Sequence, residues 1–165
     1  MSTLILGIGN PILSDDAAGI RIAEKLKEEN PELEITVTSE AGINLLDLVD
    51  GYDRLIIIDS IMTEKGTPGE VYQLKLKDLE PVMEYHSSHG IGIATAFELG
   101  QKLGFKMPQY VSIYAVEIKD NTTFREQCTG EIEKSIPEIA RQIFEKEKLG
   151  KLLSAKKSKE KARSN

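Results

Sequence analysis

The chain has 165 residues, of which 40% are hydrophobic and 29% are charged, which is ordinary for a single globular domain with a sizeable core. No apolar run approaches the length of a membrane-spanning helix, and the first residues read as a strand rather than as a signal peptide. The single cysteine, Cys128, cannot form an internal disulfide. We therefore expect a protein of the reducing cytoplasm with no membrane span.

Charge divides the chain into two parts. Residues 151–165 contain six Lys or Arg and one Glu, whereas residues 1–150 contain 15 basic and 26 acidic side chains. The body therefore has a net charge of −11 and the tail one of +5. An acidic body argues against a broad nucleic-acid-binding face, which needs basic side chains for the phosphates. We predict one α/β domain over residues 1–150, followed by a basic, disordered tail. Contact of the tail with RNA, a membrane surface or an acidic partner is the alternative.

The first half of the chain alternates between strand and helix signals. The apolar run at residues 4–8 ends in Gly9-Asn10-Pro11 and predicts a buried strand followed by a loop. Ser14 suits the cap of a helix that extends to about residue 29, with Asp15 and Asp16 in its first turn. A second strand is predicted at residues 35–38, a short helix at residues 44–49 and a strongly apolar third strand at residues 54–59.

The second half continues the alternation. A turn at residues 66–69 precedes a weaker, alternating strand at about residues 70–76, which is typical of a sheet edge. A helix at residues 90–103, a strand at residues 110–118 and a helix opening at Thr129 follow. Pro137 lies inside that last helix and is expected to kink it. Strands alternating with helices predict an α/β layered domain with a mainly parallel sheet, and the short connection before residue 70 predicts that the fourth strand is antiparallel.

This topology brings three distant side chains to one edge of the sheet. Because parallel strands joined by right-handed crossovers end at the same edge, Asp16 after the first strand and Asp59 at the end of the third strand lie at the carboxyl edge. Open α/β sheets bind ligands there when the first and third strands are neighbours at a switch point. If the fifth strand is also parallel, the helix at residues 90–103 descends from this edge, and His89 stands at its start.

Carboxylates combined with an imidazole suit a borderline transition metal such as zinc or nickel. Each residue also has a structural interpretation: Asp16 could serve the helix start, Asp59 could cap the next turn, and His89 could be a surface residue. Because all three residues are predicted at one edge of the sheet, a common metal site is favoured over three unrelated structural roles. His86 is a second choice as a ligand. Cys128 has no basic partner nearby in the sequence and is predicted to be inert.

The opening Gly7-x-Gly9 also raises the possibility of a dinucleotide-binding loop. The third glycine of that motif would fall at position 12, where the chain has Ile12. The carboxylates of Asp15 and Asp16 would in addition repel a pyrophosphate at the helix start. This interpretation is therefore weak.

Four blocks of sequence resemble the hydrogenase maturation endopeptidases. They are Gly7-Ile8-Gly9-Asn10, Ser14-Asp15-Asp16-Ala17-Ala18-Gly19, Leu55-Ile56-Ile57-Ile58-Asp59 and Ser88-His89-Gly90-Ile91-Gly92, and the resemblance covers roughly residues 3–145. It implies a three-layer α/β/α fold with a mostly parallel five-stranded sheet and one antiparallel strand. It also implies removal of a C-terminal extension from the large-subunit precursor of a [NiFe] hydrogenase, after nickel insertion.

The family's metal-contacting positions fall on Asp16, Asp59 and His89, which the resemblance assigns as the catalytic and metal-binding residues. The metal would be the nickel of the substrate, and other divalent ions could occupy the site in vitro. The chain departs from the family at Asp16, where Glu is usual, and at residues 39–42, where a Gly-Thr pair is often found. The basic tail lies outside the resemblance.

Several alternatives remain open at this point. Nickel could polarise the scissile carbonyl, activate water or serve only in recognition, and a carboxylate could act as general base. Asn10 could position the peptide or shape the turn. A metal-sensing chaperone that does not cut its partner is the main alternative function. A peptidyl-tRNA hydrolase, which shares the Gly-x-Gly-Asn-Pro opening, ranks low because of the acidic body. A monomer is favoured.

Overall fold

A computed structural model describes residues 1–79 and 90–164 of the chain. Five strands in these residues form one sheet in the order β2-β1-β3-β5-β4. All neighbouring strands are parallel except β4, which runs antiparallel to β5. The strands are β1 Thr3–Ile8, β2 Ile35–Thr38, β3 Arg54–Ile61, β4 Val71–Leu74 and β5 Tyr110–Glu117.

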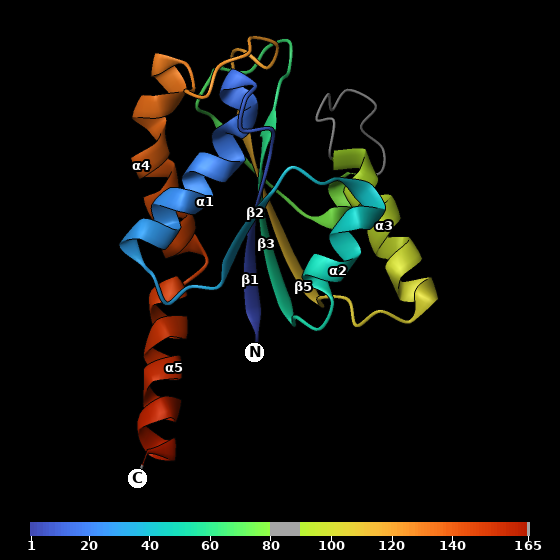
Figure 1. The fold of residues 1–165 in the computed structure, drawn as a ribbon, viewed down its shortest axis with the longest axis vertical. Helices are drawn as coiled ribbons and strands as arrows, with labels where there is room; N and C mark the ends of the chain where they lie inside the picture. Colours follow the sequence, from blue (N-terminus) through green and yellow to red (C-terminus); the bar gives the residue numbers. More distant parts are fainter. Residues whose placement is uncertain (80–89, 165) are drawn as a thin grey trace.

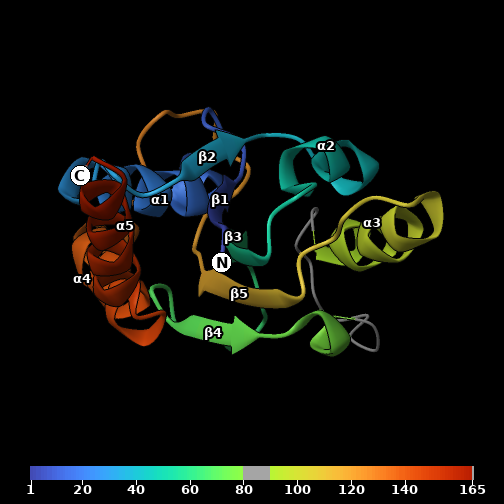
Figure 2. The same ribbon diagram turned by 90° about the horizontal axis from the view of Figure 1, so that it is seen from below.

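Helices cover both faces of this sheet. Helices α1, α4 and α5 lie on one face, and α2 and α3 lie on the other (Figures 1 and 2). The α-helices are α1 Ala18–Glu29, α2 Leu46–Val49, α3 Gly90–Leu103, α4 Gly130–Lys146 and α5 Leu149–Arg163. Three short 3₁₀ turns accompany them, η1 Ser14–Ala17, η2 Gly42–Leu45 and η3 Leu76–Asp78.

Strand β3 explains why the sheet has two covered faces. Because successive side chains of a strand point to opposite faces, its unbroken apolar run supplies both cores. Ile56 and Ile58 belong to the core under α1 and α4, whereas Leu55 and Ile57 belong to the core under α2 and α3. All four side chains are fully buried.

The predicted fold class is confirmed: this is a three-layer α/β/α domain with one antiparallel strand. Strand β1 lies between β2 and β3, so the switch point expected between the first and third strands is present. Strand β4 is an edge strand, as its alternating pattern predicts. In the described residues, no helix is both long enough and apolar enough to cross a bilayer.

Local details differ from the sequence-based expectations at two places. Ser14 does not cap a helix; it lies inside η1 with a positive φ of 48°. The short helix predicted at residues 44–49 begins earlier, as the 3₁₀ turn η2 that continues into α2. Pro137 lies inside helix α4, as predicted, and its side chain is exposed. The expected kink at this residue stays a prediction.

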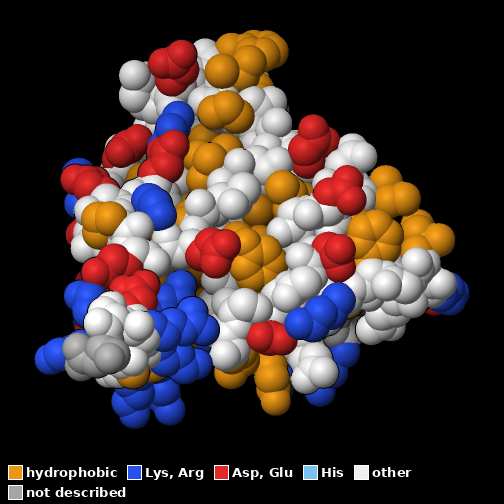
Figure 3. Space-filling view, turned by 60° about the horizontal axis from the view of Figure 1, so that its bottom comes forward, with side chains coloured by type: hydrophobic (Ala, Val, Ile, Leu, Met, Phe, Trp, Pro, Cys, Tyr) orange, Lys and Arg blue, Asp and Glu red, His pale blue; other side chains and the backbone are white. Residues whose placement is uncertain are grey.

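The basic tail is a helix in the structure, where a disordered segment was expected. Its lysine, alanine and glutamate side chains favour helix, and its first turn packs on the body. Leu149 is fully buried, and Leu152 and Leu153 pack against the core under α1 and α4. Beyond these leucines most side chains are exposed, and basic groups gather around the far end of α5 (Figure 3). The boundary expected at residue 150 therefore divides a helix whose first turn belongs to the domain.

Two truncations should separate the packed and exposed parts of α5. A chain ending at Leu153 is expected to unfold with a free energy within about 1 kcal/mol of the full chain, because it loses mainly exposed side chains. A chain ending at Lys148 also loses Leu149, and losing one buried leucine typically costs about 2–5 kcal/mol. Urea unfolding of the three chains measures the difference. Equal stability of the two truncated chains would show that the first turn of α5 contributes nothing.

Candidate active site

Close packing at the carboxyl edge places Asp16 over the ends of β1 and β3. A Cβ atom on Gly19 would lie 2.3 Å from the carbonyl oxygen of Ile58 in β3. A Cβ atom on Gly9, just after β1, would lie 2.2 Å from the carbonyl oxygen of Asp16. Only glycine fits at either position. The glycines of the Gly7-x-Gly9 opening therefore allow close helix–strand packing, and this packing places η1 against the edge of the sheet.

Asp16 and Asp59 are joined through Ser60. The Ser60 hydroxyl donates to Oδ1 of Asp16 at 3.2 Å, and the Ser60 backbone N–H donates to Oδ1 of Asp59 at 2.8 Å. The backbone N–H of Asn10 donates to the other Asp16 oxygen at 2.9 Å. Asp16 is 9% exposed and Asp59 is 4% exposed. Two buried carboxylates from η1 and β3 thus share one polar cluster at the edge where the topology predicts a site.

Asp15, the neighbour of Asp16, has a structural role. Its side chain is fully buried and accepts hydrogen bonds from the backbone N–H groups of Lys119, Asp120 and Thr129 and from the Thr129 hydroxyl. A carboxylate bonded in this way holds the connection between β5 and α4 against the carboxyl edge. Sequence reasoning assigned Asp15 only to a helix start, because its partners lie more than 100 residues away.

His89, the histidine of the predicted site, lies outside the described residues, as does His86. Helix α3 begins at Gly90, the residue after His89. The start of this helix is at the carboxyl edge, since a Cβ atom on Gly92 would lie 3.2 Å from the Cα atom of Gly42, just after β2. Among the described residues, no three His, Cys, Asp or Glu side chains are grouped to hold a metal ion. The metal-binding role of Asp16, Asp59 and His89 stays a prediction.

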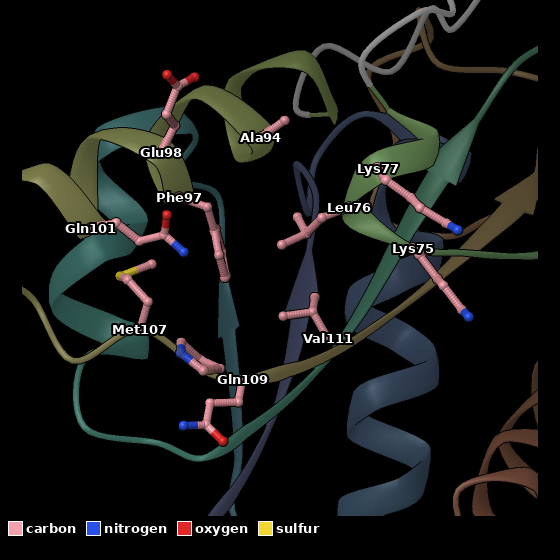
Figure 4. Close-up of a pocket in the computed structure, with 11 residues that line it drawn as sticks. Lys75, Leu76, Lys77, Ala94, Phe97, Glu98, Gln101, Met107, Gln109 and Val111 are labelled. Carbon is pink, nitrogen blue, oxygen red and sulfur yellow. The ribbon is translucent and has the colours of Figure 1, made fainter.

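A cavity of about 600 Å³ lies elsewhere, between η3, α3 and the start of β5 (Figure 4). Leu76, Phe97, Met107 and Val111 point toward one another across it, whereas Lys75 and Lys77 point away. Neither Asp16 nor Asp59 lines this space. Its titratable lining residues are Lys75, Lys77 and Glu98, and the two lysines point away from the space. The paired carboxylates of the predicted site lie at the carboxyl edge, which we therefore keep as the candidate active site.

Cys128 is a core residue. The side chain is 2% exposed and packs with Ala18, Ile118 and Ile132. Burial, followed by the nearby carboxylates of Asp15 and Glu133, raises the pKa of Cys128 to about 12. The thiol is therefore protonated at neutral pH, which argues against a thiolate nucleophile.

Thiol labelling tests this assignment. At pH 8 the native protein is expected to react with a thiol-specific disulfide reagent about 100-fold or more slowly than free cysteine, because both the raised pKa and the burial suppress attack. The same protein in denaturant should react at the rate of free cysteine and provides the control. Rapid labelling of the native protein would contradict this assignment and make Cys128 a candidate nucleophile.

Comparison with known proteins now decides the family. The sequence model of the HycI family, described as hydrogenase maturation protease, matches residues 20–146. The chain belongs to the hydrogenase maturation protease family. This confirms the resemblance drawn from the four sequence blocks and sets aside the peptidyl-tRNA hydrolase alternative. The matched stretch contains positions 59 and 89 but begins after Asp16.

Curated relatives and solved structures agree with the family. The hydrogenase 2 maturation protease of Escherichia coli K12 is 36% identical over 98 residues, which are 57% of this chain and 60% of that protein. The hydrogenase expression/formation protein HupD of Rhodobacter capsulatus is 25% identical over 149 residues, 85% of this chain and 70% of that protein. The alignment thus spans less than two thirds of the first relative.

The fold is shared with solved members. The hydrogenase maturating endopeptidase HybD from Escherichia coli superposes with a TM-score of 0.74 and 26% identity, over 91% of this chain and 94% of that one. The [NiFe] hydrogenase maturation protease HybD from Thermococcus kodakarensis gives a TM-score of 0.68 and 25% identity, over 88% and 98% of the two chains.

Proposed function

We propose that this protein is an endopeptidase that removes the C-terminal extension of a [NiFe]-hydrogenase large-subunit precursor after nickel insertion, in the cytoplasm. The single observation that carries the proposal is the pair of buried carboxylates, Asp16 and Asp59, joined by Ser60 at the carboxyl edge in a member of the maturation protease family. Asp16, Asp59 and His89 would recognise the nickel that the precursor already contains.

The chemistry of the pair supports this role. Burying a carboxylate is costly unless it is hydrogen-bonded or bound to a cation. Within residues 1–79 and 90–164, the Asp16 carboxylate receives a backbone N–H and a hydroxyl, both neutral donors. A divalent ion brought by the substrate would supply the opposite charge at this edge. Two carboxylates and one imidazole form an oxygen-rich set, so the free protein should bind divalent ions weakly and leave nickel with the precursor.

The nucleophile in this account is water rather than a side chain. The thiol of Cys128 is buried and protonated, which argues against a cysteine nucleophile. A water held by the two carboxylates would take that role. Either Asp16 or Asp59 would accept the proton of that water as general base. Ser60 would keep the two carboxylates in register, since it donates to both of them.

Intact mass spectrometry tests cleavage directly. The protein is mixed with the nickel-loaded large-subunit precursor encoded in the same genome, and both chains are weighed over time. We expect the precursor to lose one C-terminal fragment at a single bond, and a buffer-only incubation provides the control. A stable complex with an uncut precursor would instead identify a metal-sensing chaperone.

A further inference from the structure

We propose that Ile12 and Phe124 form an apolar docking surface, beside Asp16, for the hydrogenase large-subunit precursor. The inference rests on the proposed function and adds the part of the protein that holds an apolar stretch of the substrate near its nickel-bearing end. We call the two side chains the Ile12–Phe124 pair.

The pair is assembled by a contact between two distant loops. Leu13 and Arg125 form an isolated parallel β-bridge, in which the Arg125 N–H donates to the carbonyl of Ile12 at 2.9 Å and the Ser14 N–H donates to the carbonyl of Arg125 at 2.8 Å. Ile12 and Phe124 each precede a bridging residue, so the bridge joins the two loops that carry them. The two loops lie side by side at the top of the molecule (Figures 1 and 2).

Both side chains of the pair are open to solvent. Phe124 is 80% exposed and Ile12 is 48% exposed. Single exposed apolar residues are common on protein surfaces, but two of them on joined loops near a candidate active site are typical of an interface, where aromatic residues are enriched.

The loops that carry the pair are held in place by buried and backbone-directed groups. The buried Asp15 carboxylate holds both ends of the connection that contains Phe124, at Asp120 and at Thr129. The guanidinium of Arg21 spans the two loops, donating to the carbonyls of Pro11 and Glu126 at 3.4 and 3.0 Å. A surface ordered before binding loses little conformational entropy when a partner arrives.

A short chain of hydrogen bonds connects the pair to the candidate active site. The Ile12 N–H donates to the side-chain oxygen of Asn10 at 3.1 Å, and the Asn10 N–H donates to the Asp16 carboxylate at 2.9 Å. A substrate bound at Asp16 would therefore lie near Ile12. This continuity identifies the precursor as the occupant, because a second copy of the chain seated there would cover the edge that the substrate needs.

Steady-state kinetics with the nickel-loaded precursor test the surface. Ile12→Ser and Phe124→Ser are made singly and together, and the matched control is Leu103→Ser, which alters a 59% exposed apolar residue at the end of α3. We expect the double variant to raise KM by about tenfold or more with kcat within about twofold of the parent, because docking contacts contribute equally to the bound and transition states. Leu103→Ser should leave both constants unchanged.

Three results would overturn the inference: an unchanged KM in the double variant, an equal rise in KM with Leu103→Ser, or dissociation of a wild-type dimer in the double variant during size-exclusion chromatography. Failure of the proposed function would look different, since wild-type protein would then leave the precursor uncut. In that event co-purification with the tagged precursor decides. Loss of binding only in the pair variants supports the surface, and equal binding, or no binding by wild type, refutes it.

Discussion

Asp16→Asn is expected to slow precursor processing by about 100-fold or more while leaving the protein folded. An asparagine can still accept the hydrogen bond that the Asn10 N–H now donates at 2.9 Å, and its amide can meet the Ser60 hydroxyl. The negative charge is lost, and a neutral amide is a poorer partner for a divalent cation. Substitutions of groups that only support a metal ligand already cost about 10–100-fold, so a direct contact should cost at least as much.

Asp16→Glu is the matched comparison, because it retains the charge and changes only the reach. We expect this variant to process the precursor at a rate within about tenfold of the parent, since the family usually carries Glu at this position and a homologous carboxylate can meet the same cation. Both variants are compared in one intact-mass time course, with thermal unfolding as the check on folding. Full activity of Asp16→Asn would remove Asp16 from the site and leave Asp59 and His89 as its core.

Glu147→Ala is expected to have the largest effect on stability, lowering the free energy of unfolding by about 3–5 kcal/mol. Glu147 is buried where α4 meets α5, and its carboxylate pairs with the guanidinium of Arg54 and accepts the hydroxyl of Tyr114. Burial and the Glu147 carboxylate raise the pKa of Tyr114, which keeps the phenol protonated as a donor. Removing Glu147 leaves the guanidinium of Arg54, itself only 19% exposed, without its charge partner.

An exposed ion pair on α4 provides the control. Glu138 pairs with Arg141, and both side chains are 54% exposed. Glu138→Ala should therefore leave the free energy of unfolding close to that of the parent, because solvent screens such pairs. Urea unfolding of both variants gives the comparison. If Glu147→Ala were no more destabilising than Glu138→Ala, the buried cluster would not contribute to folding as described.

The sheet and the position of its carboxylates follow from local sequence signals. The apolar run at residues 54–59 indicates a strand buried on both faces, and the alternating pattern at about residues 70–76 indicates an edge strand; both are present. Right-handed connections then bring Asp16 and Asp59 to one edge, as the Ser60 hydrogen bonds show. These inferences succeed because periodicity and crossover handedness depend on few long-range details.

The features that could not be predicted from the sequence depend on contacts between distant segments. The four hydrogen bonds of Asp15 and the bridge between Leu13 and Arg125 each join segments more than 100 residues apart, and no local pattern marks them. Ser14 illustrates the same limit: a favourable cap residue is placed instead inside η1 with a positive φ, where its fully buried hydroxyl has no hydrogen-bond partner among the described residues. The tertiary bridge at the preceding residue, Leu13, overrides the local preference.

Helix α5 shows how charge can mislead. Six basic side chains among 15 residues suggest a solvated tail, yet lysine-rich sequence also favours helix, and three leucines at its start provide enough apolar surface to dock it. The signal was available at Leu149, Leu152 and Leu153, whose spacing places them on one face of a helix.

The central claim, recognition of substrate-bound nickel, is tested most directly by comparing two forms of one precursor. Nickel-loaded and nickel-free large-subunit precursor are incubated with the wild-type protein under identical conditions, and the intact mass of each is followed over time. The account predicts loss of the C-terminal extension from the nickel-loaded form only, with cleavage of the nickel-free form restored by prior loading with nickel. Equal cleavage of the two forms would contradict it.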